Sequence, residues 1–491
     1  MALSTLQQMA TERRGLAIAL AGVSASVLAI KLFLRSRVER FQQVPSWPVV
    51  GVLPSLGPGA KLIAHKIHEW ADQYGEEGVF EFNLAGNRIV CLVSWEHAKT
   101  VFSMRPMKVQ RFSVFQNAKD IAAGIFFSEG ERWKRERRIL SPAFGTKSVD
   151  GYIPAIEDVT QSLLREIEKD VAAGHEVNFS SLLPLYTADV ICSTAFGQQL
   201  NMLSSRSSDL VDDVKGMFAA VQSRMYAILP YWKIPGLGPL VDDGDKIRRS
   251  MDKRCMEAME NAKSGKSIAE KLRAMADDKF TTRELLDNFA ALFAAGTDTT
   301  SLALSWVFYH LSCDQQLQEA VAQEVRKLPD GELGLEQLNS LRMVRAVWLE
   351  TLRFTGPAEI LGLETTQELV LAGRKLPPGT QFITSFGRIL RSDPQLKRLV
   401  GNDLDVYRPS RWLGPEGIVS AQPFDTLAFG YGPRICLGMR LAEYEGLLTI
   451  AKVIQKFVLL KWEKPTPEAV TSFVSNEPVE PISIRVQPRT W

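Results

Sequence analysis

Residues 429–438 read FGYGPRICLG, and this stretch decides the fold. Three glycines and a proline within ten residues predict a tight loop, and the apolar run from Leu437 predicts that a helix follows. Backbone N–H groups of such a loop and of a helix N-terminus point toward the sulfur of Cys436. They lower the pKa of the thiol and favour a thiolate that binds a metal. The alternative is a buried cysteine in a glycine-rich turn.

A second pattern is AGTDTT at residues 295–300, inside a long helical pattern at 282–311. A glycine and several polar residues in mid-helix each weaken the helix, relative to alanine, by up to about 1 kcal/mol. Such a local conflict often marks function. Asp298 and Thr299 have side chains that relay protons through ordered water, which predicts a catalytic pair. The alternative is a kink whose side chains are solvated.

Two shorter motifs lie on predicted helices. Glu350 and Arg353 are three residues apart, so they share a helix face and can pair, as many surface residues do. Trp133 and Arg137 are four residues apart and also share a face. Basic side chains surround this second pair, namely Arg132, Lys134, Arg135 and Arg138.

Together these motifs resemble the cytochrome P450 family, over nearly the whole chain. The family's cysteine loop carries Phe, Gly, Arg, Cys and Gly, which match Phe429, Gly432, Arg434, Cys436 and Gly438. The resemblance implies that haem b is the cofactor and that Cys436 is the thiolate ligand of its iron. It also implies that Arg434 pairs with a haem propionate and that Phe429 packs beneath the macrocycle.

The same resemblance assigns roles to the other motifs. Asp298 and Thr299 become the acid–alcohol pair that guides protons on the distal side of the haem. Trp133 and Arg137 become hydrogen-bond donors to a propionate. The basic residues around them then form a surface on which an acidic electron-transfer partner docks, although a solvated helix face is equally compatible.

The role that the resemblance gives to Glu350 and Arg353 is structural. Arg411 from a later loop completes a buried cluster behind the cysteine loop. Two positions depart from the family pattern. Leu363 stands where many members have a propionate-binding arginine, and Ser410 stands where an acidic residue is usual.

The chain is predicted to divide into four parts: a short tail at 1–14, a transmembrane anchor at 15–34, a proline-rich linker at 35–60 and a haem-thiolate catalytic domain at 61–491. The twenty anchor residues are long enough to span about 30 Å of hydrocarbon. Basic residues at and after the span place the catalytic domain in the cytosol, so we expect a single-pass membrane protein of the endoplasmic reticulum. A cleaved signal peptide is the alternative.

The periodicity predicts a mainly α fold with a minor β-sheet region. A hairpin is expected at 79–93, and further strands are expected near 368–371, 381–384 and 482–486. The long helical patterns lie at 155–171, 210–227, 245–263, 282–311 and 314–327.

Composition limits the function. The 58 basic and 56 acidic residues form no long block of one sign, so a nucleic-acid partner is not expected. The five cysteines include no pair at the spacing of a metal-binding motif, and this pattern suits a reducing compartment. The expected activity is monooxygenation, in which one oxygen atom of O2 enters a lipophilic substrate such as a fatty acid, sterol or terpenoid. The expected partners are an NADPH-dependent reductase, which donates electrons, and a lipid bilayer. The alternatives are a haem-thiolate isomerase or dehydratase, and a non-enzymatic haem sensor.

The substrate pocket is expected to draw on four segments: residues 112–127, residues 293–299, residues 356–361 and the turn near Ser475. The expected apolar lining consists of Phe112, Phe115, Phe126, Phe127, Ile360 and Leu361.

Overall fold

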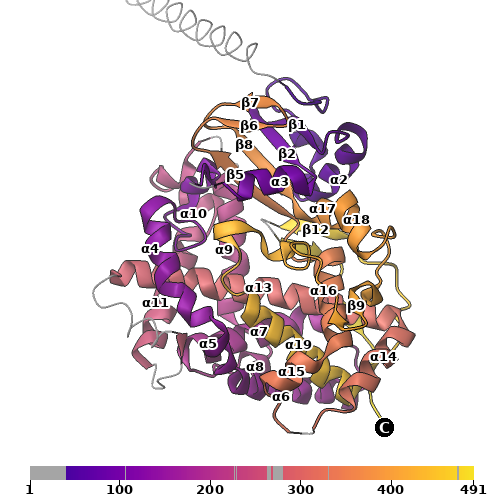
Figure 1. The fold of residues 1–491 in the computed structure, drawn as a ribbon. Helices are drawn as coiled ribbons and strands as arrows, with labels where there is room; N and C mark the ends of the chain where they lie inside the picture. The colour runs from indigo at the N-terminus through magenta and orange to yellow at the C-terminus, as the bar shows by residue number, and fades with distance from the viewer. Residues whose placement is uncertain are drawn as a thin grey trace, which may run out of the picture.

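The computed structural model describes residues 40–491 except positions 105, 106, 226, 228, 262–266, 269–279, 330, 473 and 474. The predicted tail at 1–14 and membrane anchor at 15–34 lie outside the described residues. In the described part, helices build most of the body and the largest sheet lies at one end (Figure 1). The predicted mainly α fold with a minor β-sheet region is confirmed.

Seventeen α-helices appear in the described residues. They are α2 (Ile63–Tyr74), α3 (Trp95–Phe102), α4 (Gly130–Leu140), α5 (Thr146–Asp150), α6 (Ile153–Ala172), α7 (Phe179–Phe196), α8 (Met202–Ser205), α9 (Asp209–Met225), α10 (Gly238–Val241), α11 (Gly244–Asn261), α13 (Thr282–Cys313), α14 (Gln315–Val325), α15 (Leu335–Ser340), α16 (Arg342–Thr355), α17 (Phe386–Ser392), α18 (Pro394–Val400) and α19 (Met439–Lys456). The five long helical patterns in the sequence correspond to α6, α9, α11, α13 and α14.

Helix α13 is the central element of the body. Its N-terminus is fixed by a capping box: the Glu284 N–H donates to Thr281 Oγ1 at 3.2 Å, and the Thr281 N–H donates to the Glu284 carboxylate at 3.0 Å. The helix then crosses the middle of the molecule (Figure 1) and packs against α7, α11, α16 and α19. Residues on α13 are thereby held in place from several sides.

The largest sheet has the strand order β1-β2-β8-β5-β3. The predicted hairpin is confirmed, and Ala85 and Gly86 have the positive φ angles that a tight turn needs. The predicted strands near 368–371, 381–384 and 482–486 correspond to β6, β8 and the pair β14 and β15. The strand bounds are β1 (Val79–Leu84), β2 (Asn87–Leu92), β3 (Val109–Arg111), β4 (Val177–Asn178), β5 (Ile360–Thr365), β6 (Leu369–Leu371), β7 (Arg374–Leu376), β8 (Gln381–Ser385), β9 (Leu413–Gly414), β10 (Gly417–Ile418), β11 (Phe457–Leu459), β12 (Ala469–Ser472), β13 (Ser475–Pro478), β14 (Ser483–Ile484) and β15 (Val486–Pro488).

Residues 40–60, the described part of the expected linker, pack on this sheet. The Val44 N–H donates to the Glu81 carbonyl at 2.9 Å, and the Val52 N–H donates to the Asn83 carbonyl at 2.8 Å. Val44 and Val52 are buried, as is Leu56. The segment is therefore part of the globular unit, which begins before residue 61.

Glu350 is the centre of a buried polar cluster. Arg353 donates to its carboxylate at 2.9 and 2.8 Å, and Arg411 donates at 3.0 Å. Burial by itself raises the pKa of Glu350, but the arginines outweigh it and hold that pKa below its ordinary value. Asp403 pairs with Arg411 at 3.0 Å, so an acidic side chain reaches this arginine although residue 410 is serine. The predicted cluster is confirmed.

One helix in the described residues, α7, is long and apolar enough to cross a membrane by length and composition. Of its 18 residues, 78% are buried inside the body, and the helix packs against α6 and α13. Its composition is that of a core helix with neighbours on all sides.

Candidate active site

The loop at residues 427–438 holds Cys436 between a short 3-10 helix and α19. The Cys436 N–H donates to the Phe429 carbonyl at 2.8 Å, which closes the loop. Gly432 has φ +74°, and a Cβ there would lie 2.6 Å from the Phe102 carbonyl oxygen, so only glycine fits. The predicted helix is confirmed and begins at Met439.

Protein surrounds the Cys436 thiol without packing directly against it. Its side chain keeps exposed surface, yet enough protein lies around it for burial to raise the pKa of the thiol. The N–H groups of Gly438 and Met439 and the charge of Arg137 act in the opposite direction. The predicted N–H groups are therefore present and lower the pKa of the thiol, while desolvation acts more strongly in the opposite direction.

Arg434 and Trp133 are brought together next to this loop. The guanidinium carbon of Arg434 lies 4.4 Å from the centre of the Trp133 ring, a cation–π distance. Arg434 also donates to the Ser128 carbonyl at 3.0 Å and pairs with the Glu129 carboxylate. Its Nε is buried without a partner among the described residues. This nitrogen is a donor still available to an anion.

Arg111 is a residue of the site that the sequence analysis missed. It lies on β3 directly opposite Leu363 of β5. Its guanidinium is buried, and Nε and Nη1 have no partner among the described residues. Burial and the nearby charge of Arg434 lower the pKa of Arg111 to about 9. Two buried cations with unpartnered donors fit an anionic group such as a haem propionate.

Asp298 and Thr299 are on α13, and their side chains have different partners. The Thr299 hydroxyl donates to the Ala295 carbonyl at 2.8 Å, within the helix. The Asp298 carboxylate accepts a hydrogen bond from Ser475 of β13. Burial raises the pKa of Asp298 to about 6. Asp298 can therefore change its protonation state near neutral pH.

Ala295 and Thr299 mark the face of α13 that is left uncovered. Ala295 is exposed although it lies in the middle of a central helix, and Thr299 is one turn further along the same face. Like Cys436, these residues are inside the body but not tightly packed. Their exposure fits a face of α13 that a bound cofactor would cover.

The predicted aromatic lining forms one cluster. The ring centres of Phe126 and Phe127 lie 4.9 Å apart, and those of Phe115 and Phe127 lie 5.7 Å apart. Phe112 joins through Phe115 at 6.4 Å. Arg111 lies over the Phe126 ring at 4.6 Å, so the cluster is next to the arginines.

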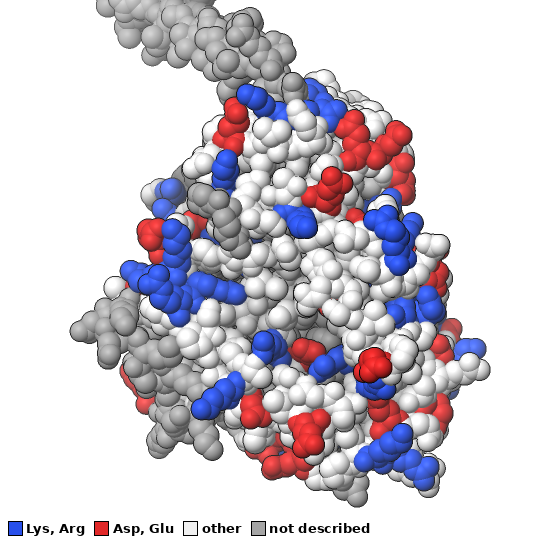
Figure 2. Space-filling view, viewed as in Figure 1, with Lys and Arg blue, Asp and Glu red and all other residues white. Residues whose placement is uncertain are grey.

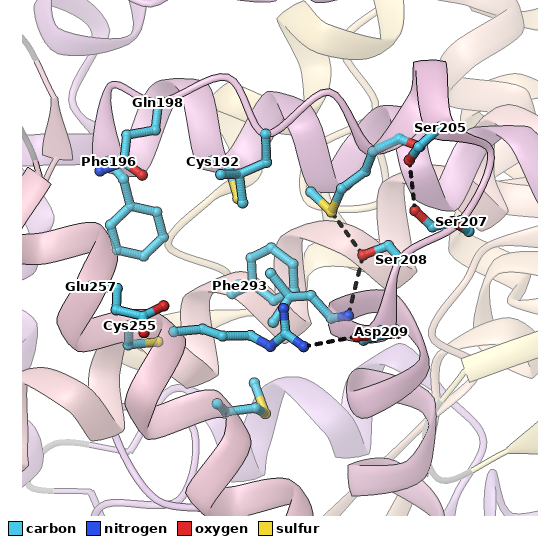
Figure 3. Close-up of a pocket in the computed structure, with 15 residues that line it drawn as sticks. Cys192, Phe196, Gln198, Ser205, Ser207, Ser208, Asp209, Cys255, Glu257 and Phe293 are labelled. Carbon is cyan, nitrogen blue, oxygen red and sulfur yellow. Dashed lines mark hydrogen bonds and ion pairs between the residues drawn. The ribbon is translucent and has the colours of Figure 1, made fainter.

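Phe293 belongs to a different cavity, of about 430 Å³, between α7, α8, α9, α11 and α13 (Figure 3). Phe293 lines it together with Cys192 of α7 and Glu257 of α11. None of the residues predicted to carry chemistry lines this cavity. Phe293, at the start of the segment expected to line the substrate pocket, lines this other cavity because it lies on another face of α13 from Ala295 and Thr299.

The basic residues around α4 gather on the surface shown in Figure 2. Several are paired within the protein: Arg132 with Glu136 at 2.8 Å, and Lys134 with Glu131 at 2.6 Å. Arg138 is exposed. The predicted basic surface is present, but its charge is partly neutralised.

A family model described as Cytochrome P450 matches residues 42–481. The human protein named sterol 26-hydroxylase, mitochondrial, is 30% identical over 366 residues, which cover 69% of this chain and 67% of that protein. The putative cytochrome P450 CYP13A3 of Caenorhabditis elegans is 25% identical over 489 residues, which cover 90% and 92%. Cytochrome P450 4d1 of Drosophila simulans is 24% identical over 517 residues, which cover 97% and 99%. With a cysteine loop and arginines that fit haem, and with a family match over most of its length, this chain belongs to the cytochrome P450 family and is a haem-binding monooxygenase.

Proposed function

We propose that this enzyme inserts one oxygen atom of O2 into a lipophilic substrate of the fatty acid, sterol or terpenoid class. An NADPH-dependent reductase is the proposed electron source. The observation that carries the substrate class is the aromatic cluster of Phe112, Phe115, Phe126 and Phe127, whose rings are apolar. The human relative is named for action on a sterol, which is compatible with this class.

Cys436 is the proposed ligand of the haem iron. When bound, a thiolate-ligated haem supplies the activation of O2 through electron donation from sulfur. Arg434, Arg111, Trp133 and Arg137 are proposed to hold the propionates. The unpartnered nitrogens of Arg434 and Arg111 support this assignment, since an anion between them satisfies donors that are otherwise buried and unpaired. Phe429 is proposed to pack beneath the macrocycle.

Asp298 and Thr299 are proposed to deliver protons to the site. The Thr299 hydroxyl uses its hydrogen for the Ala295 carbonyl, so its oxygen lone pairs are left to accept a hydrogen bond from water. Asp298 lies one residue away and is poised to exchange a proton near neutral pH. A carboxylic acid, an ordered water and a hydroxyl together make a short relay.

The two alternative functions do not use this relay. A haem-thiolate isomerase or dehydratase rearranges its substrate without O2 or a reductase, and a haem sensor gains nothing from proton delivery. Oxygen consumption with NADPH and added reductase separates these functions. The monooxygenase consumes O2 and NADPH, whereas the isomerase and the sensor do not.

The basic surface on α4 is the proposed docking face for the reductase. It lies beside Trp133 and Arg137, on the side of the cysteine loop. A second feature is a surface hollow of about 560 Å³ beside the cysteine loop, lined in part by Gln422, Tyr431 and Met439. An acidic partner surface suits this arrangement.

The proposed location is the membrane of the endoplasmic reticulum, with residues 15–34 as a single span and the catalytic domain in the cytosol. The support is the apolar sequence with its flanking basic residues.

The assignment of Cys436 is tested by a single substitution. Reduced wild-type protein with carbon monoxide is expected to show the red-shifted Soret band of thiolate ligation, and Cys436→Ala is expected to lose it. Cys313→Ala, an exposed cysteine on α13, is the control and should retain the band. A Cys436→Ala protein with an unchanged band would refute the ligand assignment. Spectral titration with fatty acids, sterols and terpenoids then tests the substrate class, which fails if only polar ligands shift the spectrum.

A further inference from the structure

The β12–β13 hairpin contacts Asp298, the acid of the acid–alcohol pair. The Ser475 hydroxyl donates to the Asp298 carboxylate. Ser475 is buried, with only 2% of its surface exposed, and its backbone is paired with Ser472 on one side and Ala358 on the other. The hydroxyl that holds Asp298 is therefore fixed in place by strand pairing.

Asn476 ties the opposite face of β13 to the body. Its backbone N–H donates to the Pro357 carbonyl at 2.9 Å, and its side chain lies 3.4 Å from the Glu359 carboxylate. Glu359 is buried and pairs with Arg391 and His68. This anchor leaves the Ser475 face of the strand directed at α13.

Glu477 shares that face with Ser475, because alternate residues of a strand point to the same side. The negative charge of Glu477 and the positive charge of Lys215 on α9 both act on Asp298. Lys215 is exposed and Glu477 is half-buried, so these two groups lie toward solvent. Asp298 thus contacts Ser475, and Glu477 follows on the same face of β13.

We propose that Ser475 and Glu477 form the proton-entry route to Asp298, with Ser475 as the positioning residue and Glu477 as the outer acid. The inference rests on the proposed role of Asp298 in proton delivery. It adds where the protons come from and which groups hold the acid in place.

The proposed step moves one proton and no electrons. The O–H bond of Ser475 breaks as an O–H bond forms on the Asp298 carboxylate. The Ser475 oxygen takes a proton from the Glu477 carboxyl, directly or through one water, and Glu477 regains a proton from bulk water. Asp298 then passes its proton inward, and the net change is one proton carried from solvent to the site.

Two substitutions near Asp298 are expected to shift its pKa in opposite directions. Burial raises its pKa to about 6, the Ser475 hydrogen bond lowers it, Glu477 raises it and Lys215 lowers it. Removing the hydroxyl in Ser475→Ala should therefore raise the pKa of Asp298 further. Removing the charge in Glu477→Gln should lower it. The pKa shifts therefore test whether both groups act on Asp298, and the peroxide yield tests whether they supply its protons.

The experiment uses the full-length holoenzyme with reductase and compares Ser475→Ala, Ser475→Thr and Glu477→Gln with the parent. The control is Glu480→Gln, which removes an exposed glutamate three residues beyond Glu477. The pKa of Asp298 is read by pH-difference infrared spectroscopy of its carboxyl band, assigned by its absence in Asp298→Asn. Hydrogen peroxide and product per NADPH are measured over the same pH range.

Ser475→Ala is expected to raise the pKa of Asp298, raise peroxide per NADPH and lower product formation by about tenfold, the size of one lost hydrogen bond to a charged group. Ser475→Thr should restore all three values because it keeps a hydroxyl. Glu477→Gln should lower the pKa of Asp298 and also raise peroxide. Glu480→Gln should match the parent.

Unshifted carboxyl bands in both Ser475→Ala and Glu477→Gln, or normal coupling of NADPH to product in both, would overturn the proton-entry route. Asp298→Asn separates this failure from that of the proposed function. If Asp298→Asn itself couples normally, the relay assignment fails. If Asp298→Asn is impaired while the hairpin variants behave like the parent, only the hairpin route fails.

Discussion

Arg111 and Leu363 face each other across β3 and β5, and Leu363 is the position at which many members of the family have a propionate-binding arginine. Directly opposed residues in an antiparallel pair have Cβ atoms about 5 Å apart, so a long side chain on either strand reaches the same space. Position 363 lacks an arginine, and position 111 supplies one. Sequence reasoning missed Arg111 because the pairing of β3 with β5 is a long-range contact that leaves no local pattern.

Arg111→Leu should weaken haem retention, since one of the two buried cations proposed to hold the propionates is lost. We expect haem transfer to excess apomyoglobin to become faster by about tenfold, as for loss of one charge-assisted hydrogen bond. The double variant Arg111→Leu with Leu363→Arg moves the guanidinium to the opposite strand and should recover most of the retention. If the single variant loses haem no faster than the parent, Arg111 holds no propionate.

Thr299→Ala should keep haem and substrate binding but divert electrons into hydrogen peroxide. The hydroxyl is the proposed acceptor for the water that delivers a proton, and neither binding nor reduction requires it. A contribution of this kind is worth about 10²-fold to 10⁴-fold, although a water that takes the place of the hydroxyl reduces the loss. Peroxide per NADPH is the measurement.

The matched control for Thr299 is Thr300→Ala, the next residue on α13, which is buried on another face. This variant should couple NADPH to product as the parent does. Equal coupling in Thr299→Ala and the parent would show that Thr299 is an ordinary helix residue.

At the scale of elements, the sequence predicted those helices that have one apolar face. Helices α6, α9, α11, α13 and α14 were found because their apolar positions recur with helical spacing. Helix α7 was not among them, because buried residues occur all around it and no polar face breaks the pattern. The conflict at residues 295–300 did point to Asp298 and Thr299, but Ser475 as the partner of Asp298 depends on a hairpin far along the chain.

Gly446→Ala on α19 should destabilise the helix that follows the cysteine loop. A Cβ at this position would lie 2.6 to 2.9 Å from three ring atoms of Trp348 on α16, and that ring is buried and rigid. Overpacking of this kind costs about 1–3 kcal/mol, which exceeds the gain of up to about 1 kcal/mol from replacing glycine in a helix. We expect a lower midpoint of thermal unfolding of the holoprotein.

Trp348→Phe provides the control for this contact, because it removes the part of the indole that the new Cβ would meet. The double variant should be less destabilised than the sum of the two single variants. Additive losses would mean that Gly446 and Trp348 do not interact as the structure indicates.

At the scale of the whole molecule, the site depends on segments that are distant in sequence. The Glu350 cluster joins α16 to the loop carrying Arg411, and residues 40–60 close one edge of the sheet. The cluster was predictable from the family resemblance, since its residues form a motif. The packing of residues 40–60 was not, because prolines and glycines predict the absence of long helices but not where an irregular segment lies.

Two truncations test where the globular unit begins. Deleting residues 1–34 removes the predicted anchor and none of the described structure, so we expect a folded, haem-loaded protein that no longer partitions as an integral membrane protein. Deleting residues 1–60 also removes Phe41, Val44, Val52 and Leu56, all of which are buried. Each fully buried apolar side chain of this size contributes about 1.5–3 kcal/mol, so four of them approach the whole stability of an ordinary domain. The longer deletion should therefore lower the yield of protein with the thiolate Soret band, or abolish it.

Two outcomes would contradict these expectations. Equal haem content and equal thermal midpoints in the two truncated proteins would mean that residues 40–60 are only a linker. Loss of haem in the shorter truncation would mean that part of the catalytic domain lies before residue 35.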